Sequence, residues 1–251
     1  MDFANILFAG PCNRACPWCI GKALPARVNR SNLELFPLPG LEHLVRQMRA
    51  HQIERVVFTG TVSDPQLYRH QRRLIEWLRA ALPWPLQISL HSNGALTLRQ
   101  LDILGTYDKA CFSIPSFDPL IYRRLMGRSR PPRLGRILEL TPIPIKVSCV
   151  VNEYNASSIS EFVTQCHELG LRRLVLRNLF GDQTDWRLMS GFEPVRFYRN
   201  NPVYDYHGME VTVWRFDQAQ VRSLNLFPDG VLSADYLLMD RFRPSTVGPR
   251  Y

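Results

Sequence analysis

The chain has 251 residues and a hydrophobic content of 45%, enough to bury one full core but not to build a second large domain. Its formal net charge is +9, because 31 Lys and Arg residues stand against 22 Asp and Glu, and this excess favours anionic partners without identifying one. The sequence has no run of about 18 uncharged apolar residues, which argues against a membrane span.

A short apolar strand is predicted at Asn5 to Ala9, and a group of three cysteines follows it directly. Cys12, Cys16 and Cys19 stand in the run Pro-Cys-Asn-Arg-Ala-Cys-Pro-Trp-Cys. This C-x3-C-x2-C spacing supplies three thiolates where a cubane iron–sulfur cluster takes four ligands. One iron would stay open to a substrate or cofactor, as at other metal centres with an incomplete protein shell.

The spacing of these cysteines is less typical of two other uses. A distant histidine could complete a zinc site, which would make the chain a zinc-bound nucleic-acid-binding module, but no Cys/His pair recurs at finger-like spacing. A disulfide framework is disfavoured because six cysteines are sparse and no signal segment precedes the strand. Cys111, Cys149 and Cys166 are isolated and predicted to be core residues. Thiolates meant for a cluster indicate a reducing compartment, so a cytoplasmic location is expected.

With Trp18 just before its third cysteine, the motif resembles that of the radical S-adenosylmethionine (SAM) enzymes. The resemblance implies a single 4Fe-4S cluster held by Cys12, Cys16 and Cys19, with SAM chelated at the open iron and Trp18 beside it. It further implies reductive cleavage of SAM to a 5′-deoxyadenosyl radical that takes a hydrogen atom from a substrate. The reducing electron donor would be of flavodoxin or ferredoxin type.

Strand and helix patterns alternate along the chain, which predicts parallel strands with crossover helices. Strands are predicted at Asn5 to Ala9, Arg55 to Thr59, Leu86 to His91, Lys109 to Ile114, Ile143 to Val151 and Arg173 to Asn178. Helices are predicted at Leu41 to His51, Pro65 to Leu82, Thr97 to Leu104, Pro119 to Leu125, Leu134 to Leu140 and Ile159 to Leu169. The expected fold is a partial (β/α)6 barrel of TIM type, with active groups at the carboxyl ends of the strands.

The loop after the second strand partly matches the family segment that hydrogen-bonds the SAM amino group. On that resemblance Thr59, Gly60 and Asp64 are cofactor-binding candidates. Gly60 also permits a close backbone approach. Asp64 before Pro65 is equally a helix N-cap, and both roles stay open.

The third strand ends in Ser92 and Asn93, similar to the family's Thr-Asn-Gly segment that faces SAM or substrate. These two residues are therefore cofactor-binding candidates, although Asn-Gly is also a common turn dipeptide. His91 lies at the same strand end, where it could shuttle a proton or be a hydrogen-bonded structural residue.

The fourth strand and the helix after it resemble the GTP 3′,8-cyclase group of molybdenum-cofactor biosynthesis, and the first serine of that segment implies Ser113 as a SAM contact. On the fifth strand, Lys146 could face an anionic substrate, the SAM carboxylate or water. On the sixth, Arg177 could bind a carboxylate or phosphate bidentately. Asn178 and Phe180, which follow it, could meet the adenosine.

Two domains are expected, a core at residues 1–182 and a C-terminal extension at residues 183–251 that packs on the barrel. Strand-like alternation at residues 208–216 and 223–231, with a Pro-Asp-Gly turn, predicts an antiparallel strand extension.

The leading functional hypothesis is a radical SAM enzyme with a small polar or anionic substrate of nucleotide, nucleoside or sugar type. Lys146, Arg177 and His91 are its candidate catalytic residues. The alternative is a peptide- or tRNA-modifying radical SAM enzyme. The sequence shows no helix-turn-helix or cysteine-rich recognition segment for a peptide, and only the positive charge is compatible with RNA.

Overall fold

The computed structural model describes residues 1–128, 130–219 and 221–235. All six predicted strands are present. They are β1 (Phe3–Phe8), β2 (Arg55–Gly60), β3 (Gln87–Ser92), β4 (Lys109–Ser113), β5 (Ile145–Val151) and β6 (Arg173–Asn178). None of the helices in the described part of the chain has the length and apolar character that a membrane crossing needs.

The predicted helices are also present, with two of them interrupted. The α-helices are α1 (Leu41–Ala50), α2 (Gln71–Ala81), α3 (Leu101–Leu104), α4 (Pro119–Met126), α5 (Leu134–Leu140) and α6 (Ile159–Glu168). Short 3-10 turns accompany them: η1 (Ile20–Ala23), η2 (Ala26–Asn29), η3 (Pro65–Leu67), η4 (Thr97–Arg99) and η5 (Ala156–Ser158).

The helix predicted at Pro65 to Leu82 is divided into η3 and α2. Asp64 caps η3 by accepting a hydrogen bond of 2.9 Å from the Gln66 backbone N–H. Tyr68 then adopts an extended backbone, with φ −69° and ψ 123°. Its ring is buried, and its hydroxyl donates to the Leu35 carbonyl at 2.8 Å. Burial of this tyrosine therefore overrides the continuous helical pattern.

The described strands form one open sheet in the order β11-β10-β1-β2-β3-β4-β5-β6-β9-β8-β7. Strands β1 to β6 are parallel neighbours, as predicted. The added strands are β7 (Arg196–Tyr198), β8 (Asn201–Tyr206), β9 (Met209–Trp214), β10 (Ser223–Leu226) and β11 (Leu232–Ser233). The fold is thus a mixed α/β fold around a large, mostly parallel sheet.

The prediction of a wholly antiparallel extension was wrong. Strand β9 pairs in parallel with β6, and β10 pairs in parallel with β1, so the two strands lengthen the parallel sheet at opposite edges. Antiparallel pairing is limited to β7–β8, β8–β9 and β10–β11. Alternating apolar residues and turn residues predict strands and local hairpins. They do not predict the parallel pairing of β9 and β10, because the partner strands are distant in sequence. Residues 236–251 of the expected extension lie outside the described residues.

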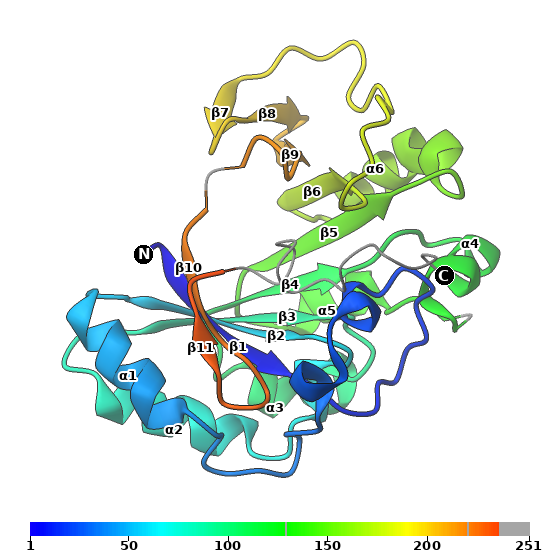
Figure 1. The fold of residues 1–251 in the computed structure, drawn as a ribbon. Coiled ribbons are helices and arrows are strands. Elements are labelled where there is room, and N and C mark those ends of the chain that lie inside the picture. Colours follow the sequence, from blue (N-terminus) through cyan, green and yellow to red (C-terminus); the bar gives the residue numbers. More distant parts are fainter. Residues whose placement is uncertain (129, 220, 236–251) are drawn as a thin grey trace, which may run out of the picture.

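The helices pack against one face of this sheet, and α1, α2 and α3 lie together along its β1–β3 part (Figure 1). Alternate strand residues on that face are buried in the main apolar core. Examples are Val56, Phe58, Ile88, Leu90, Ala110, Phe112, Val147, Cys149, Leu174 and Leu176. The opposite side, which we call the inner face, carries the other half of each strand and is largely polar. The sheet is therefore apolar where helices cover it and polar where a substrate could lie.

An ion pair links the first strand to the β7–β8 turn at the far edge of the sheet. Arg199 Nη1 lies 2.9 Å from Asp2 Oδ2, and the Arg222 backbone N–H donates to the same oxygen at 2.9 Å. These two donors lower the pKa of Asp2 from 3.8 to about 2, with the Arg199 hydrogen bond the larger cause.

We expect Asp2→Asn to destabilise the fold at neutral pH by up to about 1 kcal/mol, because the pair is partly exposed and screened by solvent. A carboxyl whose pKa is lowered on folding stabilises above its unfolded pKa, so this contribution should disappear as pH falls from about 4 towards 2. Denaturation of the wild type and the variant across this range measures the difference. Asp102→Asn is the control, since it removes an exposed pair with Arg72. A difference that persists at the acid end would contradict the assignment.

Candidate active site

The three cysteines lie in the loop between β1 and η1, which we call the cysteine loop (residues 10–19). All three are free thiols and partly buried. Each sulfur has a separate neighbour: Cys12 Sγ accepts from the Arg14 backbone N–H at 3.4 Å, Cys16 Sγ lies 3.6 Å from Met126 Sδ, and Cys19 Sγ lies 3.6 Å from the Thr61 carbonyl oxygen. Within the described residues, no group of three or more His, Cys, Asp or Glu is gathered to hold a metal ion.

Two glycines outside the cysteine loop, one in η1 directly after it and one at the end of α4, allow close backbone packing around it. A Cβ at Gly21 would lie 2.2 Å from the Thr61 carbonyl oxygen at the end of β2. A Cβ at Gly127, the C-cap of α4, would lie 2.7 Å from the Ala15 carbonyl oxygen. The Ala15 backbone N–H also donates to the Met126 carbonyl at 3.1 Å. The loop is thereby fixed between the end of β2 and the end of α4.

Side chains complete this attachment. Asn93 Nδ2, from the loop after β3, donates to Asn13 Oδ1 at 2.7 Å. Lys22 Nζ donates to the Cys16 carbonyl at 2.8 Å. Arg14 Nε donates to the Tyr122 hydroxyl at 3.2 Å, which ties the loop to α4 a second time. Three neighbouring elements therefore set the position of the cysteines.

The donor chemistry of the cysteine loop fits an iron–sulfur cluster. Burial raises the pKa of the Cys12 and Cys16 thiols, and neighbouring thiols act in the same direction. Together these causes raise the pKa of Cys16 to about 11. Bringing three thiolates together is unfavourable unless a metal centre offsets their charge. Asn13 Nδ2, in the same loop, is buried without a hydrogen-bond partner. Three free thiols and an unpaired amide donor suit a loop that holds a negatively charged metal–sulfur group.

Asp64 and Ser92, both cofactor-binding candidates, are almost completely buried in a hydrogen-bond network. Asp64 accepts from the backbone N–H groups of Gln66, at 2.9 Å, and Asn93, at 2.6 Å. Ser92 Oγ lies 2.9 Å from Asp64 Oδ1 and 2.8 Å from Gln66 Oε1. Burial raises the pKa of Asp64, while these donors act in the opposite direction. The geometry favours a role in which Asp64 and Ser92 position the loops after β2 and β3.

The remaining cofactor-binding candidates differ in their burial and in their contacts with other residues. Thr59 and Ser113 lie half-buried on the inner face, and their hydroxyls make no hydrogen bond with the described residues. Gly60 forms a tight turn, where a Cβ would meet the Ser63 carbonyl oxygen at 1.7 Å. Trp18 is 38% exposed, and its ring centroid lies 5.3 Å from that of Tyr154.

The two candidates after β6 contact the segment that follows them. Asn178 Nδ2 donates to the carbonyls of Asp182 and Thr184, the latter at 2.8 Å. The Phe180 ring centroid lies 5.8 Å from that of Phe216. The amide donors of Asn178 are therefore used within its own loop.

The predicted catalytic residues His91, Lys146 and Arg177 share the inner face. His91 on β3 and Lys146 on β5 both stand in register with Cys111 on β4. Burial, followed by the positive charges of Lys146, Arg177 and Lys109, lowers the pKa of His91 from 6.5 to about 3. His91 is thus a neutral imidazole at physiological pH.

In the cysteine loop and on the inner face, sequence reasoning missed two residues with unpaired buried polar atoms, Asn13 and Ser148. For Asn13, the only sequence feature that could have indicated a role is its position between Cys12 and Cys16. Ser148 does carry one, because it follows Lys146 by two positions and therefore lies on the same side of β5.

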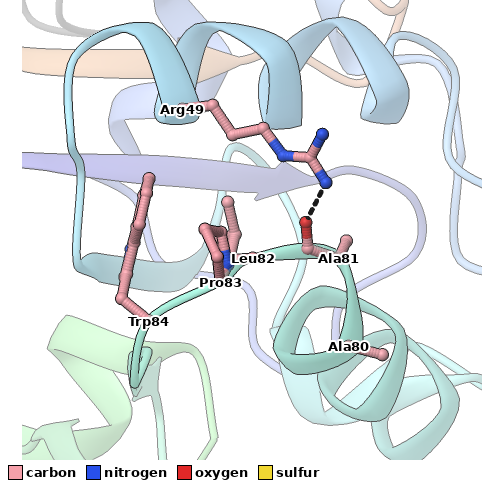
Figure 2. Close-up of a pocket in the computed structure, with 6 residues that line it drawn as sticks. All are labelled: Arg49, Ala80, Ala81, Leu82, Pro83 and Trp84. Carbon is pink, nitrogen blue, oxygen red and sulfur yellow. Dashed lines mark hydrogen bonds between the residues drawn. The ribbon is translucent and has the colours of Figure 1, made fainter.

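The open pocket in Figure 2 lies elsewhere, at the carboxyl ends of α1 and α2. Its volume is about 450 Å³, and its lining is Arg49, Ala80, Ala81, Leu82, Pro83 and Trp84. Arg49 donates to the Ala81 carbonyl across it, as Figure 2 shows. The pocket contains none of the candidate residues, so the cysteine loop and the inner face remain the better site.

No family model and no curated protein matches the chain by sequence. Solved structures share its fold. Streptococcus suis SuiB bound to precursor peptide SuiA matches with a TM-score of 0.55 and 17% identity, over 71% of this chain and 40% of SuiB. SuiB bound to S-adenosylmethionine matches with a TM-score of 0.54 and 18% identity, over 74% of this chain and 41% of SuiB.

The structure of anSMEcpe with bound AdoMet, another abbreviation of SAM, and Cp18Cys peptide matches with a TM-score of 0.55 and 16% identity, over 72% of this chain and 52% of anSMEcpe. The chain thus spans about half or less of the length of these proteins. At these identities the matches establish a common fold. The shared fold agrees with the one that the resemblance to radical SAM enzymes implies, and the similarity to the GTP 3′,8-cyclase group stays a prediction.

We expect Gly127→Ala to loosen the cysteine loop, because the new Cβ would collide with the Ala15 backbone. Gly170→Ala is a matched control. Gly170 also follows a helix with positive φ, +81° against +69° for Gly127, but nothing lies within 4 Å of its Cβ position. Both changes carry a backbone strain of about 1 kcal/mol.

Only Gly127→Ala should add about 1–3 kcal/mol of overpacking and lower the iron bound after anaerobic reconstitution. Denaturation and iron analysis of both variants test this. Equal iron content in the two variants would show that the contact does not position the cysteines.

Proposed function

We propose that this protein is a radical SAM enzyme whose Cys12, Cys16 and Cys19 hold a 4Fe-4S cluster. The observation that carries the proposal is the set of three free thiols at the carboxyl end of β1, on a fold shared with structures that bind SAM. When bound, the cluster supplies the electron that cleaves SAM to a 5′-deoxyadenosyl radical. A zinc-bound nucleic-acid-binding module is not favoured by any of these matches.

The chain's own residues would bind and orient SAM. Thr59 and Ser113 offer unused hydroxyls on the inner face, at the end of the sheet where the cysteine loop lies. Asp64 and Ser92 would hold the loops around it in place through their buried network. Trp18 would shield one side of the cysteine loop. Asn178 and Phe180 remain candidates for the adenosine through the backbone of their loop.

For the substrate, we favour a peptide over a nucleotide or sugar. Two of the matched proteins were solved with peptides bound, SuiB with precursor peptide SuiA and anSMEcpe with Cp18Cys peptide. None of the matched structures named above supports the nucleotide, nucleoside or sugar expected from the sequence. Because the chain spans 40% and 52% of those proteins, the peptide is carried over as a proposal and not as a property of the fold.

A small anionic metabolite is the second candidate, because Lys146 and Arg177 stand on the inner face. RNA has no support beyond the net charge of +9. The partial (β/α)6 TIM-type barrel remains our interpretation of β1 to β6 with their helices. A cytoplasmic location and a flavodoxin- or ferredoxin-type electron donor complete the proposal.

The proposal predicts about four irons per chain, with matching sulfide, after anaerobic reconstitution. Under a strong reductant, the reconstituted protein should convert SAM to 5′-deoxyadenosine. Cys16→Ala should abolish both cluster binding and this conversion, because two thiolates do not hold the cluster. Cys166→Ala is the control: it removes a thiol buried in the core on α6 and should lower stability by about 1 kcal/mol while leaving iron content intact.

Iron content and chromatography of the products measure the two outcomes. One zinc per chain without iron, or SAM cleavage that persists in Cys16→Ala, would contradict the assignment of the ligands.

A further inference from the structure

Lys146, Ser148 and Arg177 form a connected polar patch on the inner face. Lys146 and Ser148 lie two positions apart on the same side of β5. Ser148 stands in register with Val175 of β6, and Arg177 follows Val175 by two positions on that same side. Ser148 therefore lies between the two basic residues: it neighbours Lys146 along β5 and Arg177 diagonally across to β6, whereas the residue opposite Arg177 is Val150.

Polar atoms of this patch lack partners. Ser148 is 5% exposed, and its Oγ is buried with no hydrogen bond. Arg177 Nε is likewise buried and unpaired, although the guanidinium lies 5.9 Å from the Phe216 ring centroid. Lys146 makes no hydrogen bond or ion pair with the described residues. Buried donors without acceptors are unfavourable, so this arrangement points to an acceptor supplied from outside the chain.

The charge of the inner face indicates that the external hydrogen-bond acceptor is an anion. Strands β1 to β6 contain no Asp or Glu, but they carry five cationic residues: Arg55, Lys109, Lys146, Arg173 and Arg177. The nearest strand with a carboxylate in register is β9, whose Glu210 is already paired with Arg173, at 3.0 Å, and with Arg196. Three of these cations, Lys146, Arg177 and Lys109, also lower the pKa of His91, after burial as the larger cause. The patch is thus positive, without a carboxylate on its own strands to balance it.

We propose that Lys146, Ser148 and Arg177 bind an oxyanion of the substrate, either a carboxylate or a phosphate group. This deepens the proposed function and rests on it, because it assumes that the substrate enters along the inner face. Guanidinium and ammonium groups supply the charge, and the serine hydroxyl supplies a directional hydrogen bond. Ser148 also stands in register with Ser113, the candidate SAM contact, so the oxyanion would lie next to the SAM site. A peptide substrate would present an acidic side chain or its terminal carboxylate.

Inorganic phosphate and acetate are the probes of this site. Thermal unfolding of the full chain is followed in each salt and in sodium chloride of equal ionic strength, since a bound ion raises the unfolding midpoint. We expect phosphate, acetate or both to raise the midpoint of the wild type. The double variant Lys146→Met, Arg177→Met keeps the apolar stems and should bind the effective anion at least about tenfold more weakly.

Arg136→Met is the charge control, because Arg136 lies on α5 in an exposed pair with Glu139. It should respond to the anions as the wild type does. An equal response in the double variant, or no response in the wild type, would overturn the proposal. Stabilisation by phosphate alone would assign a phosphate group, and stabilisation by acetate alone a carboxylate.

Ser148→Ala distinguishes an anion-binding hydroxyl from a hydroxyl that only stabilises the fold. Removing an unsatisfied buried hydroxyl should leave the midpoint without anion unchanged or higher, while the response to the anion becomes weaker. Ser116→Ala is the control, since Ser116 is 4% exposed and its Oγ accepts from the Asp118 backbone N–H at 3.0 Å. It should lower the midpoint. A Ser148→Ala variant that is destabilised to the same extent would show that the hydroxyl has a partner within the protein.

SAM itself carries a carboxylate, so its affinity is measured separately by equilibrium dialysis with reconstituted protein. The double variant should bind SAM as the wild type does. If SAM affinity falls together with anion affinity, the patch holds the SAM carboxylate and the proposal is wrong. Failure of the proposed function would appear differently, as absence of iron and of SAM cleavage in the wild type. The anion titrations are independent of it, because they require neither bound iron nor SAM cleavage.

Discussion

The attachment of the cysteine loop is the constraint on which the rest of the structure depends. Gly21 packs on the Thr61 backbone and Gly127 on the Ala15 backbone, at separations that exclude any larger residue. These contacts place three thiols at the carboxyl end of β1, where the loops after β2 and β3 also converge. Without them the thiols would belong to a long surface segment and not to one site.

The sheet divides the remaining residues between stability and chemistry. One side of each strand packs against helices and carries the apolar core. The other side carries basic and hydroxyl side chains, several of them without partners. A single alternating pattern therefore produces both the stability of the fold and a positively charged inner face beside the cysteine loop. The proposed SAM site and the proposed oxyanion site are neighbours because Ser113 and Ser148 are paired across β4 and β5.

Much of the fold could be predicted because β1 to β6 and their helices have local signals: apolar strands, caps and alternation with helices. The break before α2 could not, since it follows from burial of Tyr68 against a distant backbone carbonyl. The parallel pairing of β9 and β10 was missed for a similar reason. For the site, the cysteine spacing predicts three metal ligands, which stays a prediction, whereas nothing in the sequence around Asp64 indicated its hydrogen bonds to Ser92 and Asn93. The unpaired state of Ser148 depends on what surrounds it in three dimensions.

We propose that the cysteine loop holds a cluster with one iron open to SAM. Electron paramagnetic resonance of the reduced, reconstituted protein, recorded with and without SAM, tests it most directly. We expect the spectrum of a 4Fe-4S cluster that changes in shape when SAM is added, because SAM would bind the iron that lacks a cysteine ligand. A cluster spectrum that SAM leaves unaltered, or a reconstituted protein without a cluster signal, would contradict this assignment of the cysteine loop.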